Sequence, residues 1–320
     1  MTERENLLRT LKMEGPEWIP NPNIAVAGLK PRSTVFDRPV GDAYDWFGVH
    51  WIDNVPVGSE KFLEDITEWK SRLKEPDLEA IDWEGGAAKD CANLDRENKV
   101  VWIRLNVGLF ERLHALMGFE DALMNFLVEP EATHELLDFI LDVRLKVLDK
   151  VITYYKPDVI CMHDDYGTQL DTFISPDTWR EFIKPRLKKI VDYVKSRGVF
   201  FSMHSCGKID SLIGDFVDIG ILNWDSVQDC NDIPMVFEKY GKQMSFSPHV
   251  TVSLNLEGEA DPEAKMRSVV RWYIDTLAKY GGVVPQTDSP VGDKAIIAIA
   301  SDEINVYGRD YYKRNPIQAR

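Results

Sequence analysis

The chain has 320 residues, of which 44% are hydrophobic and 28% charged, and this composition is typical of a globular protein with a substantial core. Its 38 Lys and Arg residues are outnumbered by 53 acidic residues, and the resulting net charge of −15 argues against nucleic acid or an anionic membrane surface as a partner. We expect a cytoplasmic protein with reduced thiols, because the four cysteines form no CxxC pair and the sequence shows neither a secretory signal nor a membrane-spanning run.

The first half of the chain predicts an N-terminal extension followed by a strand and several helices. A capping box from Thr2 to Glu5 begins an amphipathic helix that should end near Gly15. An irregular, aromatic-rich stretch covers residues 28–57. Hydrophobic periodicity then predicts a strand at 100–105 and helices at 108–117, 119–127 and 132–155.

From residue 158 onward, strands and helices alternate regularly. Pro185 lies inside one of the predicted helices and should kink or split it. Strands separated by helices of this length form parallel sheets, and no nucleotide-binding glycine motif follows any of them. The sequence therefore predicts one (β/α)8 barrel domain over residues 1–320. The predicted strands are 158–162, 199–204, 221–224, 243–247 and 283–285, and the helices are 175–197, 208–217, 232–240, 261–280 and 301–313.

Polar side chains gather where five consecutive predicted strands end, and in an α/β barrel the active site lies at this edge of the sheet. A single such residue is most often a helix cap or a loop hydrogen bond, but five successive ends favour a site. Adjacent residues on an extended segment point apart, so of Asp164 and Asp165 we expect only Asp165 to face the pocket. Asp165 and His249 are the candidate acid–base residues. The candidate substrate-binding residues are His163, Asp164, Tyr166, Asn223, Asp225, Gln228 and Gln286.

The segment 204–206 is a candidate metal-binding pair. Side chains two positions apart on an extended segment share a face, so the imidazole of His204 and the thiolate of Cys206 can reach one ion. Two ligands are fewer than zinc requires. The alternative interpretation is a buried cysteine beside a hydrogen-bonded histidine, since unpaired cysteines are among the most buried residues.

Three stretches resemble the uroporphyrinogen decarboxylase superfamily: the run HDDYGTQLDTFISPDTWREFIKPRLKKIVDYVKSRGVFFSMHSCGKID, the opening TERENLLRTLKMEGPEWIP and the closing NVYGRDYYKR. The resemblance implies a (β/α)8 barrel that is either a decarboxylase or a cobalamin-dependent methyltransferase. The decarboxylases carry an arginine motif, MRQAGRY, and the corresponding stretch IPNPNIAVAGLKPRS offers only Lys30 and Arg32. The chain is therefore more similar to the methyltransferase branch.

Within that branch, the resemblance implies zinc held by His204 and Cys206 and by a later cysteine. The corresponding stretch here reads GGVVPQTDSP, so Asp288 is the candidate third ligand. No DxHxxG motif is present, which implies cobalamin on a separate corrinoid protein and a small molecule as methyl donor or acceptor. A homodimer is compatible with the family. Two alternatives stay open: a metal-free decarboxylase or lyase, and a non-catalytic barrel that binds a tetrapyrrole or corrinoid.

Overall fold

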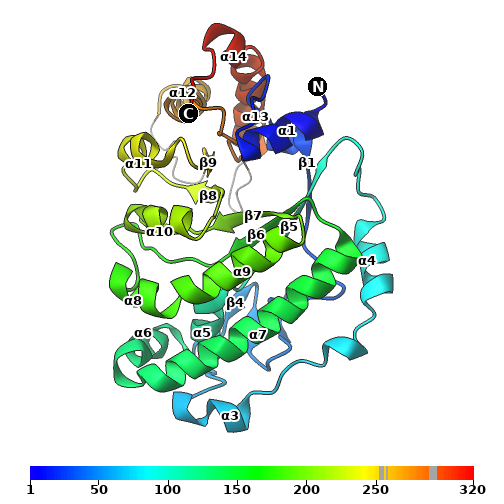
Figure 1. The fold of residues 1–320 in the computed structure, drawn as a ribbon, viewed down its shortest axis with the longest axis vertical. Helices are drawn as coiled ribbons and strands as arrows, with labels where there is room; N and C mark the ends of the chain where they lie inside the picture. Colours follow the sequence, from blue (N-terminus) through cyan, green and yellow to red (C-terminus); the bar gives the residue numbers. More distant parts are fainter. Residues whose placement is uncertain (252–255, 257–258, 288–293) are drawn as a thin grey trace.

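The computed structural model describes residues 1–251, 256, 259–287 and 294–320. Its centre is a curved parallel sheet of six strands in the order β1-β5-β6-β7-β8-β9, with helices packed outside it (Figure 1). The predicted parallel α/β architecture is therefore confirmed. The strands are β1 (Val26–Leu29), β5 (Val100–Leu105), β6 (Val159–His163), β7 (Phe200–His204), β8 (Asn223–Val227) and β9 (Ser245–Pro248).

The two edges of this sheet approach each other through the segment after α12 and the turn before β1. Val283 forms a parallel bridge with Phe246 of β9, and Gln286 forms another with His249. The side-chain amide of Asn23 then donates a hydrogen bond of 2.8 Å to the hydroxyl of Thr287. The sheet is thereby curled toward a barrel, and the carboxyl ends of its strands face one common mouth.

The helices that cover the sheet agree with the predicted order. The predicted split at Pro185 is confirmed, because two helices meet at Ile183 in place of one long helix. The α-helices are α1 (Glu3–Lys12), α2 (Pro22–Ala25), α3 (Trp69–Arg72), α4 (Trp83–Cys91), α5 (Leu109–Met117), α6 (Phe119–Val128), α7 (Pro130–Tyr155), α8 (Pro176–Phe182), α9 (Lys184–Ser196), α10 (Ile213–Asp218), α11 (Ile233–Tyr240), α12 (Pro262–Leu277), α13 (Lys294–Gly308) and α14 (Tyr311–Arg314). Short 3-10 helices cover Ile66–Glu68, Leu78–Ala80 and Asp210–Leu212.

Several predicted elements differ from the structure. The strand expected at 283–285 is not a strand, because Val283 forms only an isolated bridge with Phe246. The helix expected at 208–217 begins as the 3-10 turn at Asp210, and the helix expected at 301–313 starts earlier and ends at Gly308. The strand expected at 221–224 is β8, which runs to Val227 because its later residues pair with β9. Strand ends depend on pairing with distant partners, which local periodicity does not contain.

The barrel interior contains both apolar and polar side chains. Residues of β5, β6 and β7 form an apolar cluster with Leu7 and Leu11 of α1, whereas β8 and β9 begin with Asn223 and Ser245, whose side chains are hydrogen-bonded to each other. Thr2 caps α1 as expected, since its hydroxyl accepts the backbone N–H of Glu5 at 3.1 Å. The cluster consists of Leu7, Leu11, Ala25, Val100, Trp102, Val159, Cys161, Phe200 and Val284.

A small antiparallel sheet, β2-β3-β4, belongs to the N-terminal extension, and its strands are β2 (Ala43–Tyr44), β3 (His50–Ile52) and β4 (Val55–Pro56). Its neighbourhood is fixed to the barrel by the guanidinium of Arg112 on α5. Arg112 is fully buried and forms ion pairs with both Asp37 and Asp45. The charged contact adds to the packing of Phe47, Val49 and Trp51, which belong to the main apolar core.

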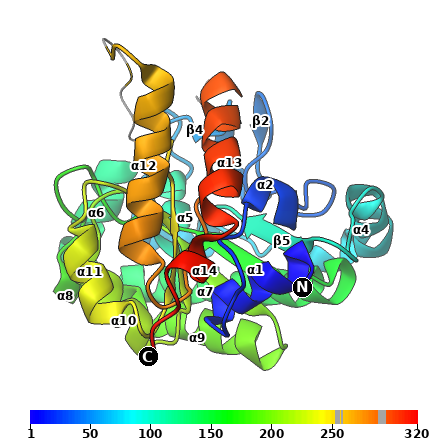
Figure 2. The ribbon, with the colours of Figure 1, turned by 90° about the horizontal axis from the view of Figure 1, so that it is seen from above.

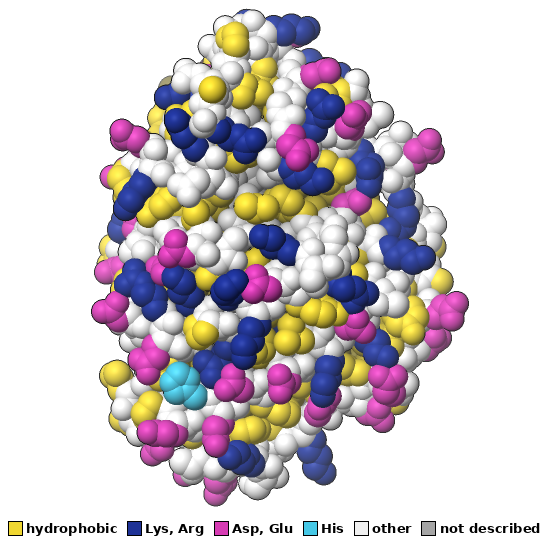
Figure 3. Space-filling model, viewed as in Figure 1, with side chains coloured by type: hydrophobic (Ala, Val, Ile, Leu, Met, Phe, Trp, Pro, Cys, Tyr) yellow, Lys and Arg dark blue, Asp and Glu magenta, His cyan; other side chains and the backbone are white. Residues whose placement is uncertain are grey.

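The outer helices carry mixed charge. Figure 3 shows Lys and Arg side chains interspersed with Asp and Glu across the face formed largely by α7 and α9. The ion pair Lys188–Asp192 lies within α9, and Lys150 of α7 pairs with Glu79 of the 3-10 helix Leu78–Ala80. Figure 2 shows α12 and α13 packed side by side. No helix in the described part of the chain is long and apolar enough to cross a membrane.

Candidate metal centre at the ends of strands β6, β7 and β8

The register of three neighbouring strands places His163, His204 and Asp225 in one row. His163 of β6 is paired with His204 of β7, and His204 is paired with Asp225 of β8. Paired residues of parallel strands point to the same face, so the three side chains enter the barrel mouth together. The sequence order of the strands thus gathers residues separated by up to 62 positions in the chain (163 to 225).

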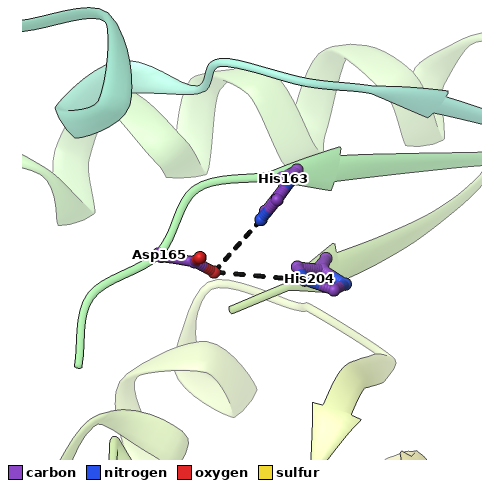
Figure 4. Close-up of side chains that lie close together, drawn as sticks. All are labelled: His163, Asp165 and His204. Atoms are coloured by element: carbon purple, nitrogen blue, oxygen red, sulfur yellow. Dashed lines mark ion pairs between the residues drawn. The ribbon is translucent and has the colours of Figure 1, made fainter. Parts of the chain in front are cut away.

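Asp165 joins this row from the loop after β6. Its Oδ1 atom lies 3.2 Å from Nε2 of His163 and 4.0 Å from Nε2 of His204 (Figure 4). These three residues present ligand atoms within 4.8 Å of one another. The Nε2 atom of His163 is buried and forms no hydrogen bond with any residue in the described ranges. The arrangement leaves a converging set of nitrogen and oxygen atoms that a cation could bind.

Cys206 lies beside this group, next to His204. Its Sγ atom lies 3.4 Å from Nε2 of His204, and its backbone N–H donates to Oδ1 of Asp165 at 2.7 Å. Two ligands bound tetrahedrally to zinc at about 2.0–2.3 Å are separated by about 3.3–3.6 Å. The His204–Cys206 and His163–Asp165 distances are close to that separation, and the His204–Asp165 distance is wider. The group within 4.8 Å therefore consists of His163, Asp165 and His204, and Cys206 contacts it through His204.

The carboxylates around His163 control its charge. Burial would lower the pKa of His163, but the negative charges of Glu111 and Asp165 outweigh it and raise the pKa to about 9. Burial raises the pKa of Glu111, whose Oε1 lies 3.7 Å from Nε2 of His163. The pKa of Asp165 is lowered, because the neighbouring His163 outweighs the effect of burial. Positive charge is therefore stabilised at this point of the mouth.

His204 and Cys206 are shifted toward their neutral forms. Burial, with the charge of His163, lowers the pKa of His204 to about 4. Burial, with the charge of Asp165, raises the pKa of the Cys206 thiol to about 12. A neutral imidazole is the form that binds metals, and a cation at this site would favour the thiolate over the thiol.

Asp225 lies behind His204 and connects it to two further residues. Its Oδ2 atom lies 3.4 Å from Nδ1 of His204 and accepts a hydrogen bond of 3.0 Å from Arg104, while its Oδ1 atom lies 3.3 Å from Nε2 of His249. Burial would raise the pKa of Asp225, but Arg104 and His204 outweigh it and lower the pKa well below the usual range. A second group of potential ligands therefore exists, formed by His204, Asp225 and His249.

Several predicted site residues are held by hydrogen bonds within the protein. Asp164 is fully buried and accepts backbone N–H bonds from Leu109, Phe110 and Glu111, so it caps α5. The hydroxyl of Tyr166 donates to the same carboxylate. Asp165 faces the mouth, as adjacent side chains on an extended segment require. The buried side chain of Asn223 bonds to Ser202, Ser245 and Ser247 in the barrel wall.

The remaining predicted residues lie around the mouth or outside the described part. Gln228 accepts the backbone N–H of Gly207 at 3.0 Å and so supports the turn after Cys206. Gln286 lies at the edge of a cavity beside β1. Asp288, the candidate third ligand, lies outside the residues that the structure describes. Substrate contacts for Asp164, Tyr166 and Asn223 would require breaking these internal bonds, and we do not include them in the site proposed below.

Two residues beside the candidate metal ligands were not predicted from the sequence. They are Arg104, which contacts Asp225, and Glu111, which contacts His163. Arg104 is an inward-facing position of β5, and its alternation with Trp102 was the available signal. Glu111 is in the first turn of the helix that follows the same strand. Both lie near the end of β5, where the sequence predicted no site residue.

Two cavities lie beside the candidate metal site, one next to Arg104 and one next to His249. One, of about 450 Å³, opens between β1 and the segment ending at Thr287, and Trp102 and Arg104 form part of its wall. The other, of about 410 Å³, lies beside His249 and is lined by Asp229, Val250, Ser268, Val269, Trp272 and Tyr273. Each is large enough for a small molecule.

The model of the uroporphyrinogen decarboxylase (URO-D) family matches residues 72–268, which is more than half of the chain. The chain belongs to this family. It is 27% identical over 148 residues to the methylcobamide:CoM methyltransferase MtaA of Methanosarcina barkeri, and that alignment covers 46% of this chain and only 42% of the relative. A methyltransferase structure from Methanosarcina mazei superimposes with a TM-score of 0.71 at 14% identity and covers 96% of this chain and 99% of that one.

The family predicted from the sequence is thus confirmed, and the structural match over almost the full length confirms the barrel fold. Both similar proteins are methyltransferases, which supports the branch that the missing arginine motif indicated.

Proposed function

We propose that this protein is a zinc-assisted, cobalamin-dependent methyltransferase that moves a methyl group between a small molecule and a corrinoid carried by a partner protein. The observation that carries the proposal is the convergence of His163, Asp165 and His204 at the carboxyl ends of β6 and β7, with the sulfur of Cys206 3.4 Å from Nε2 of His204. Similarity to MtaA, whose name states a methylcobamide substrate, supports this activity over others of the family.

The donor set fits zinc better than a harder ion. Zinc accepts imidazole, thiolate and carboxylate ligands together, whereas magnesium and calcium prefer oxygen alone. The buried Nε2 atom of His163 points at the carboxylates of Asp165 and Glu111, at 3.2 and 3.7 Å. The carboxylates of Glu111 and Asp165 raise the pKa of His163 and so favour a positive charge beside them. A divalent cation bound there would supply this charge in place of the proton on the imidazole. In this proposal His163 and Asp165 supply the further ligands, for which the sequence offered Asp288.

Zinc bound here would hold a thiol as its thiolate, or polarise the oxygen of a methyl ether. The protein's own residues set the conditions for that chemistry. Asp225 orients His204, and Glu111 supplies a buried carboxylate beside His163 that can accept a proton as a thiol enters. The cavity beside Arg104 provides room for the small molecule next to the cluster. The partner's corrinoid would approach from the open mouth, where the strand-end loops meet.

Methyl transfer to a thiol is tested with free methylcobalamin under anaerobic conditions. The sulfur–carbon bond forms as the cobalt–carbon bond breaks, the electron pair stays on cobalt, and the thiol proton is released. We expect the spectrum to change from methylcob(III)alamin to cob(I)alamin and the thioether to appear by mass spectrometry. Methoxy compounds with cob(I)alamin test the reverse direction.

The matched pair Cys206→Ala and Cys230→Ala distinguishes the site from general effects of losing a cysteine. Cys230 lies outside the cluster, and its sulfur contacts only the amide of Asn231 among the hydrogen bonds of the described residues. The proposal expects Cys206→Ala to lose methyl transfer and Cys230→Ala to keep it. Carbon dioxide release from carboxylic acids without any corrinoid would contradict it and favour a lyase.

A further inference from the structure

An irregularity in β8 lies directly behind the candidate metal ligands. Asp225 pairs with Ser247 of β9 and Val227 pairs with the next residue, Pro248, so Ser226 is an extra residue that forms a bulge. Its φ angle is +71°, in the left-handed region that side chains other than glycine rarely adopt. Bulges of this kind frequently redirect a side chain beside an active site.

The bulge changes where the Ser226 side chain points. In a regular strand, neighbouring residues face opposite sides, so Asp225 and Ser226 could not both enter the barrel mouth. Here Oγ of Ser226 lies 3.2 Å from Sγ of Cys206, and Oδ2 of Asp225 lies 3.4 Å from Nδ1 of His204. Both residues are fully buried. Two consecutive residues of one strand therefore contact two different candidate ligands.

We propose that the Asp225–Ser226 bulge is a positioning element for the metal ligands, in which Asp225 orients the His204 imidazole and the Ser226 hydroxyl donates to the Cys206 thiolate. A thiolate can only accept, so the direction of the serine hydrogen bond is fixed once Cys206 is ionised. A carboxylate on Nδ1 leaves Nε2 as the metal-binding nitrogen of His204. The proposal rests on the metal centre of the proposed function, and it assigns roles to residues that do not themselves bind the ion.

The strained backbone at Ser226 supports a functional role over chance. Glycine would adopt the same φ angle without steric cost, yet the position holds a side chain whose hydroxyl reaches Cys206. The same bulge leaves Asp225 in register with His204. A regular strand could support one of the two ligands, and the bulge supports both.

The test uses three variants of the full chain and one control. Ser226→Ala and Ser226→Gly both remove the hydroxyl, but only the glycine variant relieves the φ angle. Asp225→Asn keeps the size of the side chain and removes its charge. Ser245→Ala is the control, because Ser245 is an equally buried serine of the barrel wall that bonds to Asn223 and the carbonyl of Leu222 and does not contact Cys206.

Zinc affinity is measured by competition with a chromogenic chelator, and the thiolate-to-metal absorption band is recorded after cobalt substitution. Both Ser226 variants and Asp225→Asn should bind zinc about 10- to 100-fold more weakly than the wild type, as other ligand-supporting residues do. The two Ser226 variants should also shift the cobalt–thiolate band. Ser226→Gly should melt at a higher temperature than Ser226→Ala, and Ser245→Ala should keep wild-type affinity.

The outcomes separate this inference from the proposed function. If the wild type binds zinc and both Ser226 variants keep its affinity and cobalt band, the bulge is only a backbone feature and the inference is wrong, while the metal centre stands. If the wild type binds no zinc or cobalt, both are wrong.

Discussion

The sulfur of Cys206 lies 3.4 Å from Nε2 of His204, and both side chains face the loop that carries Asp165. The contact is produced by local geometry, because residues two positions apart at the end of β7 share a face. The turn that follows holds Cys206 in place. Its glycine, Gly207, has a φ angle of +81°.

Replacing Gly207 should disturb the site more than replacing another glycine of similar conformation. A Cβ atom at Gly207 would lie 2.1 Å from the carbonyl oxygen of Gly167, which is backbone and cannot rotate away. Gly198 has a φ angle of +74° and open space around it. We expect Gly198→Ala to cost about 1–2 kcal/mol of unfolding free energy from the backbone angle alone. Gly207→Ala should cost more and also weaken zinc binding, as measured by denaturant unfolding and chelator competition. Equal losses of unfolding free energy in Gly207→Ala and Gly198→Ala would contradict the close backbone contact at Gly207.

The Arg112 ion pairs should be the most sensitive charged contacts outside the site. Removing the guanidinium leaves Asp45 buried without its ion-pair partner, while Asp37 keeps its ion pair with Arg144, and breaking a buried pair in this way costs about 3–5 kcal/mol. Arg112→Met should therefore lower the free energy of unfolding by that amount. Lys188→Ala removes an exposed pair with Asp192 and should change it by less than about 1 kcal/mol. Urea unfolding of both variants makes the comparison, and a small effect of Arg112→Met would show that the extension is held by other contacts.

His114 should make the protein less stable in mild acid. Burial between Phe110 and Phe119, with the charge of Arg112, lowers the pKa of His114 to about 4. Above about pH 6.5 the imidazole is neutral in both the folded and unfolded states and has no effect. As the pH falls from about 6.5 to 4, only the unfolded chain takes up a proton, so stability falls by about 2–3 kcal/mol.

His114→Gln should lack this contribution. The difference between the unfolding free energies of wild type and variant, measured at several pH values, removes the effects of the other titrating groups. It should change across the window from about 6.5 to 4 and be constant above it. A difference that is independent of pH would contradict the lowered pKa.

The candidate site could be predicted from the sequence where it depends on local geometry. The pair His204 and Cys206 is visible as a motif, and the opposed directions of Asp164 and Asp165 follow from the extended backbone. Capping by Asp164 could not be predicted, since its partners Leu109, Phe110 and Glu111 lie more than 50 positions away in the chain. The regular alternation also predicted the parallel fold, whose strands pair in chain order from β5 to β9.

The register between neighbouring strands could not be predicted from the sequence. The pairing of His163 with His204 and of His204 with Asp225 decides which side chains meet, and no local pattern encodes it. The bulge at Ser226 is equally invisible, because a serine carries no sign of a positive φ angle. Glu111 was missed for a similar reason, since an acidic residue in the first turn of a helix usually stabilises the helix dipole.

The central claim, a metal centre built from His163, Asp165, His204 and Cys206, is tested most directly by elemental analysis of the purified protein. Wild type is compared with Cys206→Ala, His163→Ala and the control Cys230→Ala, all expressed with zinc supplied. The account predicts about one zinc per chain in the wild type and in Cys230→Ala, and a loss of zinc in the other two variants. A wild type without metal, or variants of His163 and Cys206 that keep full zinc content, would contradict it.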